Sequence, residues 1–269
     1  MSHIDCENIE TAISSLEKIS RISRKYFIPF LKRKYEEFNT IEDLFMNNDF
    51  ESWILSEFIL ALNVEKLDVK SVSFFHMSRL PEHLIEGIIQ EGLKPTKEVF
   101  PRLIKFLKEL FPEITDDDWK EIESSTDWIP FGKLDGRDEF IPHGFGTMEW
   151  GLKNNDSYLK SPEICEDIIR HLEKRYPYMM GRFLESTKPL IVKATGIVTK
   201  ESHIKKTISY ITKRIMSEDV PVPWTYYYES NIPPERIELI IILNDSLEEI
   251  KRIICKGFRA KQKGTEHSF

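Results

Sequence analysis

Apolar residues return every three or four positions through the first part of the chain, which is the spacing of one face of an α-helix. The pattern predicts one helical segment over about residues 9–45 and a second over about residues 49–62. Pro29 is expected to kink or interrupt the first segment, because proline removes a backbone donor and clashes with the preceding turn. The polar stretch 63–70 follows, so residues 1–66 are predicted to form a helical N-terminal region.

The pattern changes to that of a strand at residues 71–80, where valine and phenylalanine flank a single histidine, His76. Ser78 is expected to cap a helix over about residues 81–90, since its hydroxyl can accept from the free amides of a first helical turn. Gly92 then suits a left-handed turn just past the helix end. This is the one stretch in which local structure positions a polar residue for chemistry.

Helical and strand patterns follow one another in the rest of the chain without regular alternation. Helices are predicted for about residues 96–111, 161–175, 201–216 and 246–255, and strands for about residues 190–198, 225–229 and 237–243. A segment rich in glycine and tryptophan, residues 127–150, is predicted to be a long ordered loop, a place where ligands often bind. The sequence therefore predicts an α+β protein, with one domain over residues 67–255 and a flexible basic tail at 256–269.

Composition narrows the classes of function. The formal charge of −7, from 38 basic and 45 acidic residues, disfavours broad attraction to nucleic acid or anionic membranes. The three cysteines are far apart in sequence, which indicates a reducing compartment and no disulfide framework. With no signal peptide and no apolar run of about 20 residues, the expectation is a cytoplasmic protein without membrane contact. No metal site is expected, because the three aspartates at 116–118 fit the first turn of a helix better than a calcium loop.

Three short motifs, in their order along the chain, resemble the ADP-ribosyltransferase-like fold. They are a strand ending in an H-x-S motif (Phe75-His-Met-Ser78), a helix closed by Glu91-Gly-Leu93, and Ile-Pro-Pro-Glu-Arg-Ile at residues 232–237. Bacterial and phage-borne toxins and RNA 2′-phosphotransferase-like proteins are among the members that look like this. The resemblance covers about residues 70–245, and it implies a split mixed or antiparallel sheet with flanking helices.

What the resemblance implies for function is cleavage of NAD⁺ as a substrate. His76 would match the family histidine that bonds the adenosine-side ribose, with Ser78 and Arg79 beside the NAD⁺ and Arg79 within reach of its diphosphate. An aromatic residue would stack on nicotinamide, and the candidates are Phe145, Trp150 and Tyr158. The ADP-ribosyl group would go to a macromolecular acceptor, protein or nucleic acid, in conflict between a microbe and its phage or a competitor.

The family also uses a glutamate that opens the strand before the final turn, where this sequence has Trp224-Thr225. Glu229, at the end of that strand, is the catalytic candidate, and Glu218 lies before it. Two alternatives stay open. His76 also fits a hydrogen-bonded core histidine, and the whole domain also fits a catalytically degenerate module that binds a protein partner through the N-terminal helices.

Overall fold

The computed structural model describes residues 2–41, 50–63, 67, 69–124, 142–154, 157–197, 202–216, 224–227 and 231–243. The chain forms two compact units. Unit 1 comprises residues 1–75, 143–151 and 193–226, and unit 2 comprises residues 76–142, 152–192 and 227–269.

A six-stranded sheet has the order β5-β3-β2-β4-β6, with β1 also paired to β2. The strands are β1 (His3–Ile4), β2 (Ser71–Leu80), β3 (His143–Phe145), β4 (Lys188–Ile197), β5 (Thr225–Tyr227) and β6 (Ile237–Ile242). The sheet is mixed, because β1 runs parallel to β2 while β3 runs antiparallel to it, with Phe75 opposite Phe145. Helices and a mixed sheet together confirm the predicted α+β class. The strands β2 and β4 each contribute residues to both units.

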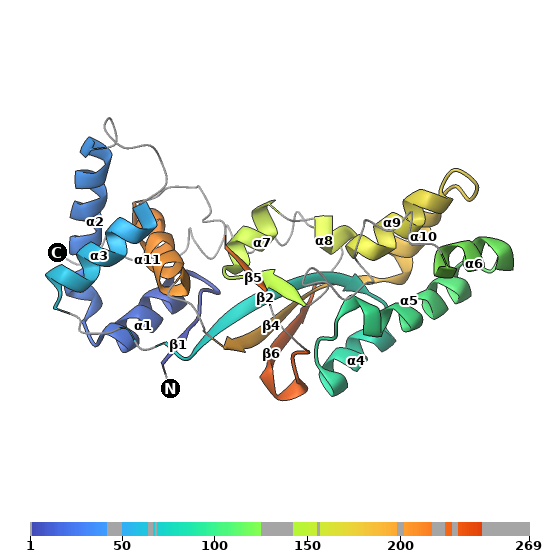
Figure 1. Cartoon of the computed structure of the whole chain (residues 1–269), viewed down its shortest axis with the longest axis horizontal. Helices are drawn as coiled ribbons and strands as arrows, with labels where there is room; N and C mark the ends of the chain where they lie inside the picture. Colours follow the sequence, from blue (N-terminus) through green and yellow to red (C-terminus); the bar gives the residue numbers. More distant parts are fainter. Residues whose placement is uncertain are drawn as a thin grey trace, which may run out of the picture. The chain divides into compact units, whose positions relative to one another are not determined.

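The helices of unit 1 gather around α11 (Ser202–Ile215), which packs against α1 (Ile9–Ser20), α2 (Arg24–Ile41) and α3 (Phe50–Ala61) (Figure 1). Their core contains the fully buried side chains of Phe27, Ile54, Phe58 and Tyr210. The predicted N-terminal helices thus share a core with a helix from much later in the chain. The predicted domain boundary after residue 66 stays a prediction.

The break between the first two helices lies before Pro29, so Pro29 does not interrupt the helix, while the predicted kink stays a prediction. The chain turns instead at Arg21, whose φ of 58° is left-handed. Glu17 holds the turn, since its carboxylate accepts from the backbone amide of Arg24 at 2.9 Å and from the Arg24 Nε at 3.1 Å. Pro29 lies inside α2, where it removes one backbone hydrogen bond without ending the helix.

Unit 2 contains the remaining helices and an apolar core of its own. They are α4 (Glu82–Glu91), α5 (Thr96–Leu110), α6 (Asp116–Ser124), α8 (Ser157–Lys160), α9 (Glu163–Leu172) and α10 (Met179–Ser186), while α7 (Met148–Asn154) begins in unit 1. Side chains of α5, α6, α9 and α10 meet in this core, with Leu107, Ile122, Ile168 and Phe183 completely buried.

Ser78 does not cap a helix, which corrects one prediction. The strand β2 continues to Leu80, and the N-cap position of α4 is taken by Pro81 in an extended conformation. Ser78 is therefore a buried strand residue. Sheet pairing keeps the backbone of β2 extended, and a residue before proline is itself biased to extended backbone, so the helix starts later than the capping signal suggests.

Candidate functional site

His76 is a partly exposed residue in the mostly buried strand β2. Seven of the eight residues at positions 72–79 of β2 are buried, and His76 is the one that is only half-buried. At the centre of this strand, His76 is thus the residue that keeps partial exposure. The prediction that the local structure positions His76 for chemistry stays a prediction.

The two other motifs of the series are joined to each other within unit 2. Leu93 and Ile232 form an isolated antiparallel bridge, in which each backbone amide donates to the other residue's carbonyl at 2.9 Å. Gly92 has a φ of 81°, and a Cβ atom at this residue would lie 1.8 Å from the Ile232 carbonyl oxygen. Only glycine therefore allows the backbone after α4 to approach the Ile-Pro-Pro turn so closely.

Arg79 has a structural role in unit 2. Its guanidinium donates to the Thr187 hydroxyl at 2.9 Å and to the carbonyl oxygens of Leu159, Leu184 and Thr187 at 3.3, 2.6 and 3.0 Å. The residue is 8% exposed. These contacts tie β2 to α8, to α10 and to the start of β4, and the predicted contact of Arg79 with a diphosphate stays a prediction.

The predicted aromatic candidates lie in different parts of the chain. Phe145 is a buried residue of β3 in unit 1, and Trp150 is half-buried in α7, with its amide donating to the Thr147 hydroxyl at 3.1 Å. Tyr158 is half-buried in α8 of unit 2, the unit that also holds His76, Ser78 and Arg79. Glu229 lies outside the described residues.

Unit 1 contains a buried cluster of polar side chains that was not predicted from the sequence. Glu149 of α7 forms an ion pair with Arg214 of α11 at 3.3 Å, and the two side chains are only 5% and 11% exposed. Tyr210 lies one helical turn before Arg214, and burial, together with the nearby Glu149 carboxylate, raises the pKa of its phenol. The spacing of Tyr210 and Arg214 on one helix face was the available signal, but nothing in the sequence pointed to Glu149 as their partner.

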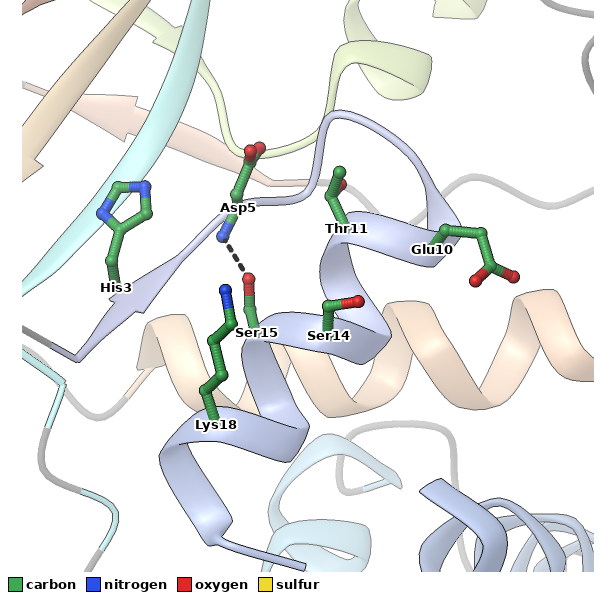
Figure 2. Close-up of a pocket in the computed structure, with 7 residues that line it drawn as sticks. All are labelled: His3, Asp5, Glu10, Thr11, Ser14, Ser15 and Lys18. Atoms are coloured by element: carbon green, nitrogen blue, oxygen red, sulfur yellow. Dashed lines mark hydrogen bonds between the residues drawn. The ribbon is translucent and has the colours of Figure 1, made fainter. Parts of the chain in front are cut away.

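A pocket of about 340 Å³ in unit 1 was also not predicted (Figure 2). It lies between the segment that follows β1 and one face of α1, and it is lined by His3, Asp5, Glu10, Thr11, Ser14, Ser15 and Lys18. In the sequence, the polar residues of this helix face have the spacing of an ordinary solvated surface.

Comparisons with known proteins give no classification of this chain beyond its α+β class. No protein-family model, no curated protein and no solved structure matches it. Within the described part of the chain, no group of three or more histidine, cysteine or acidic side chains is placed to hold a metal ion. None of the helices in the described ranges has the length and apolar content that a membrane crossing requires.

Proposed function

We propose that this protein is an ADP-ribosyltransferase-like enzyme that uses NAD⁺ to modify a protein or nucleic acid. The observation that carries the proposal is the bridge between Leu93 and Ile232, which brings the Glu-Gly-Leu and Ile-Pro-Pro motifs together in the unit that contains His76. If the short motif matches had arisen by chance, there would be no reason for the matched segments to hydrogen-bond to each other. The order of the three motifs along the chain also supports the proposal.

His76 supplies the second support. The proposed role is a hydrogen bond from its imidazole to a ribose hydroxyl, which requires a ring that a ligand can reach. The half-buried position of His76 in β2 is compatible with that requirement.

The reaction breaks the bond between nicotinamide and C1′ of its ribose, and the bond electrons leave with nicotinamide. Positive charge develops on the ribose as an oxocarbenium-like transition state, which a nearby carboxylate stabilises. Glu229 is the residue proposed for that carboxylate, and an acceptor nucleophile then attacks C1′ and loses its proton. The donors of Arg79 bond to Thr187, Leu159 and Leu184, so the proposal does not depend on the predicted contact of Arg79 with the diphosphate.

The test is incubation of the full chain with NAD⁺, followed by chromatography for released nicotinamide and by transfer of label from the adenosine half. We expect His76→Ala and Glu229→Gln each to lower nicotinamide release by about 100-fold, the scale of losing a catalytic contact. His83→Ala is the matched control, because His83 is an exposed histidine of the neighbouring helix α4 and is expected to leave the rate unchanged. Equal rates for His76→Ala and wild type would refute the proposal.

A second candidate function, a non-catalytic module that binds a protein partner, is favoured by one observation. Arg79, a residue that the family resemblance placed at the diphosphate, bonds instead to protein carbonyls and to a hydroxyl. This candidate predicts no NAD⁺ turnover in any variant and a partner complex that survives His76→Ala. The nicotinamide assay therefore separates the two functions directly.

A further inference from the structure

The pocket beside α1 has a wall whose geometry is fixed by the sheet. The His3 imidazole lies between two serine hydroxyls of β2, with Nδ1 at 2.8 Å from Ser71 Oγ and Nε2 at 2.9 Å from Ser73 Oγ. The opposite wall is α1, whose start is fixed by a capping box between Asn8 and Thr11. A pocket with two fixed walls is largely preformed, so a ligand does not have to order it.

The carboxylates that line the pocket are already paired with cations of the protein. Asp5 accepts from Lys193 Nζ at 2.7 Å, and Glu10 accepts from Arg24 Nη1 at 3.1 Å. Each carboxylate has about four lone-pair positions, so both can still accept hydrogen bonds from ligand hydroxyls. Each of the two carboxylates therefore already has a protein cation beside it.

The hydrogen-bond donors that remain lie along the same helix face. Ser14 and Ser15 each already accept one hydrogen bond, from Arg24 Nη2 at 3.0 Å and from the Asp5 amide at 3.0 Å. Neither hydroxyl hydrogen has an acceptor within the described ranges, so both can donate to a ligand. Lys18 lies one turn further along, and it alone of the charged lining residues has no ion-pair partner among the described residues.

Figure 2 shows the Lys18 ammonium extending toward the side of the pocket where Ser15 and Asp5 lie. Lys18 is therefore the one lining cation without an ion-pair partner among the described residues, and it stands beside two hydroxyl donors. Behind the lining, Glu7 shares Lys193 with Asp5, and Glu17 shares Arg24 with Glu10, so each of these groups keeps a surplus negative charge. Because that surplus repels a dianion more strongly than a monoanion, it favours a monocarboxylate bound at Lys18 over a phosphate dianion.

We propose that this pocket binds a small polyhydroxylated monocarboxylate, a molecule of the chemical class of sugar acids. Lys18, Ser14 and Ser15 bind the carboxylate, and the free lone pairs of Asp5 and Glu10 accept from the ligand hydroxyls. The volume of about 340 Å³ is near the lower end of the range for small-molecule sites and suits one sugar-sized molecule. All lining residues belong to unit 1, so this site is independent of the proposed NAD⁺ chemistry.

The experiment is a chemical-shift titration of the ¹⁵N-labelled full chain with three probes, which are gluconate, sorbitol and acetate. Gluconate carries both the carboxylate and the hydroxyls, whereas sorbitol lacks the carboxylate and acetate lacks the hydroxyls. We expect gluconate to bind at least about tenfold more tightly than either, with shifts at the amides of α1 and of residues 3–5. Inorganic phosphate serves as a fourth probe and is expected to bind more weakly than gluconate.

Lys18→Gln is expected to weaken gluconate binding by about tenfold, since it removes one charge-assisted contact. Lys25→Gln is the matched control, because Lys25 is an exposed lysine of unit 1 that does not line the pocket. Ser14→Ala gives a second, smaller loss on the same wall. Gluconate binding no tighter than acetate binding, or a Lys18→Gln variant that binds like wild type, would overturn the proposal.

Discussion

Glu149 and Arg214 pair inside unit 1 with both side chains almost fully buried, whereas in unit 2 the pairs Arg102–Glu91 and Arg182–Glu113 lie at the surface. Lys193 repeats this pattern in unit 1, since its side chain is 10% exposed and its ammonium pairs with both Asp5 and Glu7. In unit 2, by contrast, the interior described above is formed by leucine, isoleucine and aromatic side chains. Unit 1 thus buries both partners of an ion pair, whereas each ion pair within the described part of unit 2 keeps at least one partner exposed.

The difference predicts how each unit responds to mutation. Removing one partner of a buried ion pair leaves the other charge without compensation, which costs about 3–5 kcal/mol, while an exposed pair contributes at most about 1 kcal/mol. Unit 1 is therefore expected to be sensitive to single charge deletions. Unit 2 is expected to be sensitive to changes in its apolar core and in its close backbone contacts.

The largest expected effect is that of Arg214→Met. It leaves the Glu149 carboxylate buried without its cation, and we expect the free energy of unfolding to fall by about 3 kcal/mol, measured by urea denaturation. The double variant Glu149→Leu with Arg214→Met removes both charges and should recover most of that loss. A single variant as stable as wild type would show that the pair does not hold unit 1 together.

The next effect tests the close backbone contact of unit 2. Gly92→Ala places a methyl group 1.8 Å from the Ile232 carbonyl oxygen at a positive φ, so the bridge must open, and we expect a loss of about 3 kcal/mol in thermal or urea unfolding. Gly181→Ala is the control, because Gly181 lies within α10 with no atom near the added methyl group. Alanine there should stabilise the protein by roughly 0.5–1 kcal/mol through helix propensity.

A third prediction compares two lysines on the same strand, β4. Burial acts to lower the pKa of Lys193, but hydrogen bonds to Asp5 and Glu7 outweigh it and raise the pKa, so the ammonium stays charged at neutral pH. Lys193→Met should cost about 2 kcal/mol in a denaturation experiment, since it leaves two acidic groups without their cation. Lys188→Met should change stability by less than about 0.5 kcal/mol, because Lys188 is half exposed and 3.8 Å from Glu82. Equal losses of stability for the two variants would contradict the expected difference between the units.

The smallest effect is a pH dependence in unit 2. Hydrogen bonds from Tyr176 and Thr115, with the neighbouring Arg175, hold the pKa of Asp118 below its ordinary value. A carboxyl group with a lowered folded-state pKa stabilises the fold above its unfolded pKa of about 3.9, and the contribution is lost as pH falls through the folded value. We expect Asp118→Asn to be less stable than wild type at pH 7 and the difference to shrink below about pH 4. Unfolding curves at several pH values check this, and a difference that persists at low pH would assign the loss to packing.

The sequence predicted the long elements well, because their periodicity is local. Strand β2, helix α11 and the positive φ of Gly92 lie where the patterns placed them. The break at Arg21 was not predictable from proline alone, since the side chain of Glu17 closes that turn.

Contacts between distant segments were the main part that the sequence could not supply. Arg79 has the residue type of a phosphate ligand, and only the fold reveals that Thr187 and the carbonyl of Leu184 take its donors. The pairing of Glu149 with Arg214 likewise depends on how α7 and α11 meet. The strand that contains His76 was predicted from the sequence. The partial exposure of His76 between buried neighbours follows from the sheet.

Whether His76 belongs to an NAD⁺ site is tested most directly by calorimetric titration of NAD⁺ into the full chain. We expect saturable binding by the wild type and by His83→Ala, with at least about tenfold weaker binding by His76→Ala. Absence of NAD⁺ binding by the wild type, or equal affinity for wild type and His76→Ala, would contradict it.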